Sequence, residues 1–149
     1  MAEALTISDL RLAFRSSQRV QQDAFALLKA TASLVNTDDN SDVAREMVLR
    51  ALDQQDLFAA YQPILDSLAR AVGLFPYMNT DSLDMRDAIA YEFHRPLNMA
   101  ADLVFHREQA RIYQRLLAGD SVVLSAPTSF GKSKIIDAII ASNKFANLV

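Results

Sequence analysis

The chain has 149 residues, of which 51% are hydrophobic and 22% are charged, and its formal net charge is −3. This balance is typical of a folded soluble protein, and it argues against a disordered chain or one that holds nucleic acid by overall positive charge. The sequence contains no cysteine and two histidines, which excludes disulfides and thiolate metal sites and leaves a histidine-based zinc site unexpected.

The beginning of the chain does not read as a targeting segment. Residues 1–11 lack the basic stretch and apolar run of a secretion signal, and no segment approaches the roughly 18 uninterrupted apolar residues of a membrane span. We therefore expect a cytoplasmic protein without membrane contact, which also fits the absence of cysteine.

Residues 7–70 favour helix, because apolar residues recur three and four positions apart and β-branched runs are few. Residues 8–35 favour one long helix, with a break at the polar residues 16–19 as the alternative. After an acidic loop, Asn40 or Ser41 is expected to cap a helix whose apolar face is formed by Val43, Met47, Val48 and Leu52. A further helix over residues 54–70 is expected to tolerate Pro63 as a kink and to bury Leu57, Tyr61, Ile64, Leu65 and Leu68.

The next predicted element is a short helix that ends at Pro96, because the residue before a proline is pushed out of helical geometry. Asp81 or Ser82 is expected to cap it, and it carries the apolar residues Met85, Ile89 and Phe93. The step from Arg95 to Pro96 is the predicted domain boundary. Residues 1–95 are thus predicted to form a mainly α accessory domain.

From residue 104 the pattern changes. A helix through residues 108–117 closes at Gly119, the apolar run at 121–125 predicts a buried strand, and a loop then leads into another helix. Helix, strand, loop and helix in this order open an α/β nucleotide-binding core. Residues 96–149 are therefore predicted to form the incomplete start of such a lobe.

Residues 126–133, which we call the phosphate loop, carry the chemistry of the predicted site. Successive backbone amides that feed a helix amino terminus bind phosphate together with the positive end of the helix dipole. Gly131 permits close approach of the backbone, Lys132 is expected to reach the terminal phosphates, and the Ser133 hydroxyl is expected to bind Mg²⁺.

The phosphate loop meets the general pattern G-x-x-x-x-G-K-[ST] only in part, since Ala126 stands where the first glycine is usual. The expected strand before it and the expected helix after it, over residues 134–142, supply the required context. The alternative is a plain turn from a strand to a helix, with Lys132 as a surface lysine.

Part of the phosphate loop resembles motif I of superfamily 2 helicases, namely Ala126-x-Thr128-Ser129-x-Gly131-Lys132-Ser133. The serine at position 129, in place of a middle glycine, makes the motif similar to that of the Ski2-like branch. Gln109 lies 23 residues before Lys132, a spacing similar to that of the Q-motif glutamine in DEAD-box proteins. The resemblance implies a RecA-like P-loop NTPase lobe. It also implies an ATP and Mg²⁺ site with Lys132 in a catalytic role and phosphate contacts from Ala126, Pro127, Thr128, Ser129, Phe130, Gly131, Lys132 and Ser133.

The same resemblance implies that the amide of Gln109 reads the edge of adenine and that Phe105 or His106 stacks near the base. Phe105 also reads as a core aromatic residue, and Gln109 as a solvated helix residue. The basic stripe formed by Arg107, Arg111 and Arg115 reads as ordinary surface.

Residues 74–77, 86–87, 91–96 and 105–109 together look like the entry to helicase subunits of DEAD/DEAH-box type in bacterial antiphage defence systems, such as the Hachiman type. Residues 1–73 resemble no family. The resemblance implies an amino-terminal portion of an ATP-dependent helicase that acts on DNA or RNA, with a nuclease or effector subunit as partner. The intact protein is expected to hydrolyse ATP and this chain alone is not, because hydrolysis also needs a carboxylate pair on a later strand and arginines from a second lobe, and neither is part of the 149 residues.

Three alternatives remain open. The chain could belong to a different P-loop ATPase, or it could be a helical protein-interaction module with a vestigial phosphate loop. A truncated regulator of an intact homologue is the third.

Overall fold

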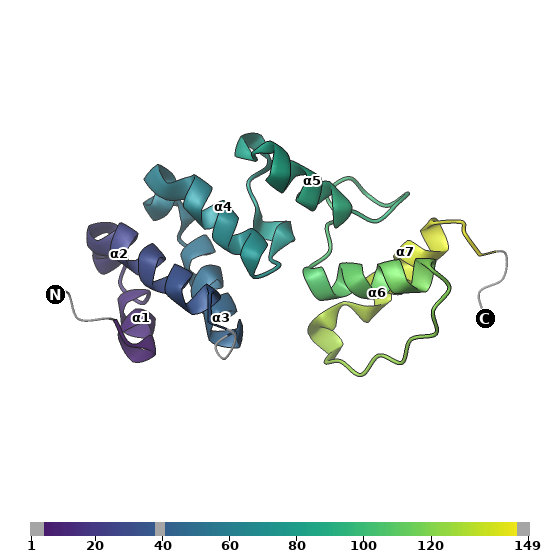
Figure 1. Ribbon diagram of the computed structural model, residues 1–149, viewed down its shortest axis with the longest axis horizontal. Coiled ribbons are helices and arrows are strands. Elements are labelled where there is room, and N and C mark those ends of the chain that lie inside the picture. The colour runs from purple at the N-terminus through teal and green to yellow at the C-terminus, as the bar shows by residue number, and fades with distance from the viewer. Residues whose placement is uncertain (1–4, 38–40, 146–149) are drawn as a thin grey trace. The chain divides into compact units, whose positions relative to one another are not determined.

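The computed structural model describes residues 5–37 and 41–145, and every regular element in those ranges is helical (Figure 1). The α-helices are α1 (Ile7–Ala13), α2 (Ser17–Val35), α3 (Ser41–Leu52), α4 (Gln62–Ala71), α5 (Met85–Phe93), α6 (Arg107–Leu117) and α7 (Lys132–Ala141). Short 3-10 turns cover Gln55–Tyr61, Phe75–Tyr77, Thr80–Ser82 and Thr128–Phe130. The mainly helical character predicted for residues 1–95 is confirmed in the described part of that range.

The chain divides into two compact units. The first consists of Met1–Val72 and Tyr77–Leu83, and the second of Gly73–Pro76 and Asp84–Val149. The predicted boundary between functional domains at Arg95 and Pro96 stays a prediction. Within the described part of the chain, no helix has the length and apolar character that crossing a membrane requires.

The first unit begins with two helices where one long helix was favoured. Thr6 caps α1 in a capping box, since its Oγ1 accepts from the Asp9 amide at 3.2 Å and the Asp9 carboxylate accepts from the Thr6 amide at 3.0 Å. Ser16 then caps α2 by accepting from the Arg19 amide at 3.4 Å. The single long helix is therefore wrong and the alternative break at residues 16–19 is confirmed, because Ser16 offers the backbone a cap in place of a continuing helix.

The core of the first unit lies where α2, α3 and α4 meet. Its buried apolar side chains include Val20, Leu27, Leu28, Met47, Val48, Phe58, Leu65 and Leu68. The predicted apolar face of α3 is confirmed for Met47, Val48 and Leu52, whereas Asn40 lies outside the described residues.

The predicted single helix over residues 54–70 is corrected. The structure has a 3-10 turn followed by α4, and Pro63 sits in the first turn of α4. Proline is tolerated there because the amide it lacks has no acceptor inside the helix, so no kink is needed. Ile64 is 38% exposed and is not part of the core.

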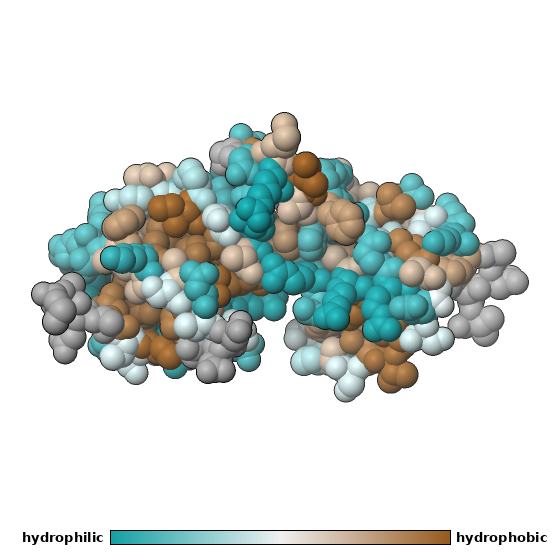
Figure 2. Space-filling view, in the orientation of Figure 1, coloured by the Kyte–Doolittle hydropathy of each residue, from teal (hydrophilic) through white to brown (hydrophobic). Residues whose placement is uncertain are grey.

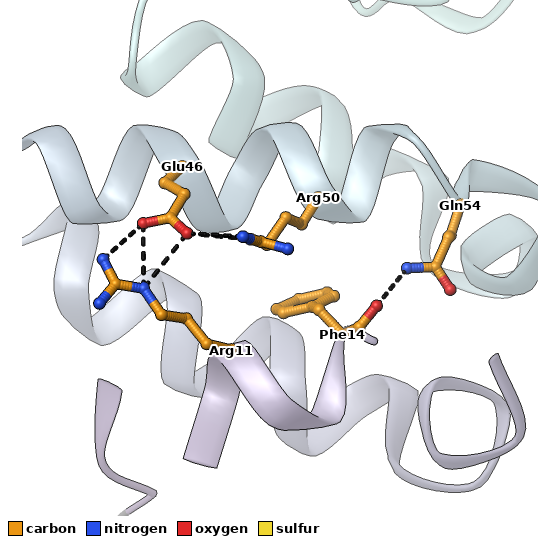
Figure 3. Close-up of polar contacts among 5 residues, drawn as sticks. All are labelled: Arg11, Phe14, Glu46, Arg50 and Gln54. Atoms are coloured by element: carbon orange, nitrogen blue, oxygen red, sulfur yellow. Dashed lines mark hydrogen bonds and ion pairs between the residues drawn. The ribbon is translucent and has the colours of Figure 1, made fainter. Parts of the chain in front are cut away.

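An ion-pair network joins α1 to α3, as Figure 3 shows. The Arg11 guanidinium donates to the Glu46 carboxylate, with Nη2 and Oε2 2.7 Å apart, and Arg50 donates to the same carboxylate at 3.0 Å. These contacts, led by the hydrogen bond from Arg11, hold the pKa of Glu46 below its ordinary value. The Gln54 amide adds a bond to the Phe14 carbonyl at 2.9 Å.

The second unit is built around α6 and α7. Its core consists of Phe105, Ala110, Tyr113, Ile135, Ala138 and Ile139. The Arg107 amide donates to the Gly73 carbonyl at 3.2 Å, and the Phe75 ring stacks on His94 with centroids 3.5 Å apart. These contacts tie residues 73–76 to the rest of the unit.

The predicted buried strand at residues 121–125 is wrong, because no strand is present in the described residues. A strand is stabilised by the backbone hydrogen bonds that it forms with a neighbouring strand. The described parts of the chain contain no strand with which residues 121–125 could pair. Val123 is fully exposed, and Figure 2 shows apolar residues at the surface of this part of the molecule. The α/β core that this strand was to open is therefore not formed in the structure.

Helix α5 begins later than expected. Its cap is Asp84, which accepts from the Asp87 amide at 2.8 Å, and not Asp81 or Ser82, which lie in a 3-10 turn. Its end just before Pro96 is confirmed. The apolar residues Met85, Ile89 and Phe93 are 82%, 64% and 67% exposed, so this helix presents an apolar stripe at its surface.

Candidate phosphate-binding site

The phosphate loop forms a tight turn between residues 121–125, which have no regular secondary structure, and α7. The Phe130 amide donates to the Pro127 carbonyl at 3.1 Å, which closes the 3-10 turn Thr128–Phe130. Gly131 follows in the left-handed region, with φ 80° and ψ 34°, and α7 begins at the next residue. Glycine suits this position because other residues are strained at positive φ.

Space at Gly131 is restricted as well. A Cβ atom at this position would lie 2.7 Å from Nε2 of Gln109, which is closer than carbon and nitrogen atoms approach without displacement. The turn therefore requires glycine for two separate reasons, the backbone angle and the packing against Gln109.

The Lys132 side chain folds back over the phosphate loop. Its ammonium group donates to the Ala126 carbonyl at 2.5 Å and to the Pro127 carbonyl at 2.9 Å. The first residue of α7 is thereby tied to the start of the loop. The positive charge is held by two neutral acceptors of the loop.

The loop and the start of α7 carry further hydrogen-bond donors. The first amides of α7, which include those of Lys132 and Ser133, have no acceptor inside the helix and carry the positive end of its dipole. The residues Thr128, Ser129 and Ser133 are exposed. The arrangement can hold an anion with several oxygen atoms through an ammonium group, backbone amides and hydroxyls.

Gln109 is buried, with 8% of its surface exposed, and both ends of its amide make hydrogen bonds. Its Oε1 accepts from the His106 amide at 2.9 Å, and its Nε2 donates to the Phe130 carbonyl at 2.7 Å. The structure thus brings Gln109 to the phosphate loop. Its predicted reading of adenine stays a prediction.

Phe105 lies in the core of the second unit. It is 1% exposed and packs edge-on against Tyr113, with ring centroids 5.6 Å apart. His106 is half-buried and caps α6 through its backbone. Stacking of either ring on a base stays a prediction.

Two features of the site were not anticipated from the sequence. The return of Lys132 to the carbonyls of Ala126 and Pro127 is one, and the bond from Gln109 to Phe130 is the other. The spacing of Gln109 from the loop was the one signal for the second, although it was interpreted as a contact with the base.

Metal ligands are sparse around the loop. Across residues 5–37 and 41–145, no group of three or more His, Cys, Asp or Glu side chains is placed to hold a metal ion. The expected binding of Mg²⁺ by the Ser133 hydroxyl stays a prediction.

The chain is similar in sequence to an anti-bacteriophage protein. The family model of the Anti-bacteriophage protein B N-terminal domain matches residues 1–88. Over 128 residues the chain is 36% identical to Anti-bacteriophage protein B of Escherichia coli (strain K12), an alignment that covers 85% of this chain. The chain spans 17% of the length of that relative. No solved structure matches the chain.

These findings correct the resemblance to superfamily 2 helicases of the DEAD/DEAH-box and Ski2-like types and to Hachiman-type subunits. No helicase family matches, and the family that does match covers residues 1–88 and ends before the phosphate loop. Residues 1–73, which resembled no family, fall inside that domain. The motif that carried the helicase identification is short, and the strand that supported it is not formed.

Proposed function

Because the chain belongs to the family of the Anti-bacteriophage protein B N-terminal domain, we propose that it takes part in defence against bacteriophages and binds ATP through its phosphate loop. The chain spans 17% of the relative's length, so ATP hydrolysis is proposed for the longer protein. The observation that carries ATP binding is the position of Lys132, whose ammonium group reaches back to the carbonyls of Ala126 and Pro127 in the loop.

When a triphosphate binds, we expect the Lys132 ammonium group to exchange its carbonyl acceptors for phosphate oxygens. In the structure the Lys132 ammonium donates to two neutral carbonyls, and anionic phosphate oxygens are stronger acceptors for a charged donor. The first amides of α7 would bind the same phosphate group, because they point out of the helix amino terminus. Mg²⁺, when bound, neutralises charge on the phosphates, and the Ser133 hydroxyl is the proposed protein ligand.

Hydrolysis needs further groups. Phosphoryl transfer requires a residue that positions the attacking water and charges that stabilise the transferred group. Asp137 is exposed on α7 and one turn beyond the loop, and we assign it no such role. We propose that the remaining groups come from other parts of the longer protein, and that DNA or RNA is its partner.

Two lysines on α7 provide a matched test of ATP binding. We expect Lys132→Ala to lower the affinity of the chain for Mg²⁺-ATP by at least tenfold, which is the loss of about 1.4 kcal/mol. Lys134→Ala, which removes an exposed lysine two residues away, should leave the affinity unchanged. Isothermal titration calorimetry measures both. Equal affinities of the Lys132→Ala variant and the wild type, or no binding by the wild type, would overturn the proposal.

A second function is favoured by the apolar stripe on α5. Met85, Ile89 and Phe93 are four residues apart, so they lie on one side of the helix, and all three are more than half exposed. Such a stripe fits a helix that docks on a partner protein, here a nuclease or effector subunit. Coexpression with the protein encoded beside this gene tests it. Retained association after all three are changed to serine would count against docking here.

A further inference from the structure

The contact of Gln109 with the phosphate loop crosses 21 residues of sequence. Gln109 lies in the first turn of α6, and its Nε2 reaches the Phe130 carbonyl at 2.7 Å. The other end of the same amide accepts from the His106 amide at 2.9 Å. Since 8% of the residue is exposed, little of this amide is accessible to a base.

The bond fixes the part of the loop that turns into α7. The Phe130 carbonyl belongs to the peptide that joins Phe130 to Gly131, and Gly131 carries the left-handed backbone angles of the turn. Holding this carbonyl holds the plane of that peptide, and therefore the direction of its N–H group. The orientation of the first amides of α7 depends on the same turn.

The anchor at the other end of the bond is rigid. Helix α6 buries Ala110 and Tyr113 in the core of the second unit, and Phe130 packs half-buried against that core. Gln109 therefore connects a packed helix to an exposed turn. A donor held in this way orders the phosphate loop before any ligand arrives.

We propose that Gln109 is a positioning residue for the phosphate loop, so that it strengthens binding of the triphosphate group whatever base the nucleotide carries. The inference depends on the proposed function, because it assigns a role within the same site. It differs from the sequence-based expectation, in which the amide of Gln109 reads adenine.

The variant Gln109→Glu separates these two roles. A glutamate has the same shape and accepts from the His106 amide as the glutamate of a standard capping box does, so the start of α6 is kept. It lacks the donor that reaches the Phe130 carbonyl, and it places an anionic acceptor there instead. Gln109→Asn, whose side chain is one methylene shorter, is the second variant in case the first does not fold, and its fold is checked by circular dichroism.

The ligands are ATP, GTP and inorganic triphosphate, each titrated with Mg²⁺ into the 149-residue chain. We expect Gln109→Glu to weaken all three by about tenfold and to an equal extent, because a buried hydrogen bond contributes about 1 kcal/mol and an uncompensated acceptor adds to that loss. The difference from the wild type should narrow as the pH falls towards about 4.3, where the introduced carboxyl gains a proton and can donate again.

The outcomes distinguish the inference from the function it depends on. If the wild type binds none of the three ligands, the proposed function fails. If the wild type binds all three and the variants weaken ATP alone, Gln109 reads the base and the inference is overturned. Unchanged affinities for all three in a folded variant overturn it as well.

Discussion

Replacing Gly131 with alanine tests the construction of the turn. The residue has φ 80°, and the left-handed region costs a residue with a Cβ atom about 1–2 kcal/mol. The new Cβ atom would also lie 2.7 Å from Nε2 of Gln109, so the amide must move and its bond to the Phe130 carbonyl is lost. That bond adds about 1 kcal/mol, for a total of about 2–3 kcal/mol.

Gly119 provides the matched control. It has φ 91°, and a Cβ atom there would meet nothing within 4 Å. Gly119→Ala therefore carries the backbone cost without the steric one. The difference between the two variants, about 1 kcal/mol, isolates the contact with Gln109.

Urea unfolding measures the effect, because the cost of each substitution then enters the same free energy of unfolding, although Gly119 follows α6 and Gly131 precedes α7. Gly131→Ala should lower that free energy by about 1 kcal/mol more than Gly119→Ala does. If both variants lose equal stability, the packing of Gln109 against Gly131 does not stabilise the turn and the reasoning fails.

Three further predictions concern charge and burial. Glu46→Gln should reduce the loss of stability on acidification, because the folded pKa of Glu46 is lowered, mainly by the Arg11 hydrogen bond. Its contribution is present above the ordinary pKa of 4.5 and is lost as the pH falls below it, which urea midpoints at pH 5 and pH 3 measure. Burial lowers the pKa of His94, so part of the stability should be lost as the pH drops below 6.5, and His94→Asn should remove that part between pH 7 and pH 5. Leu65→Ala should cost about 2–5 kcal/mol in urea unfolding because the side chain is fully buried, whereas Ile89→Ser, at an exposed position, should change stability by less than about 0.5 kcal/mol.

Signals that act within one helical turn allowed the mainly helical character and some helix faces and ends to be predicted. The apolar spacing of Met47, Val48 and Leu52 identified the buried face of α3, and Pro96 marked the end of α5. The first boundary was misjudged although Ser16 offered a cap, because the apolar pattern continues on both sides of it. Local preference alone does not decide whether such a residue caps a helix or faces solvent within one.

The strand at residues 121–125 shows why other parts could not be predicted. Its composition favours an extended backbone, but a strand exists only with a partner, and the partner is not specified by the segment itself. The hydrogen bond from Gln109 to Phe130 could not be predicted from the local sequence either, because it depends on how α6 packs beside the loop. The close approach of Gly131 to phosphates stays a prediction, whereas the restriction that the structure shows there comes from Nε2 of Gln109, which would lie 2.7 Å from a Cβ atom.

The unpaired segment at residues 121–125 also affects how the chain behaves at high concentration. It has no regular secondary structure, is uncharged and contains two adjacent valines, of which Val123 is fully exposed. Such an edge is a template on which identical segments of other molecules add as strands, and this is the first step of aggregation. Asp120 and Pro127 flank the segment, and a charge and a proline are the residues that limit the growth of such assemblies. Light scattering that rises with protein concentration, and that Val123→Lys suppresses, would identify this edge as the source.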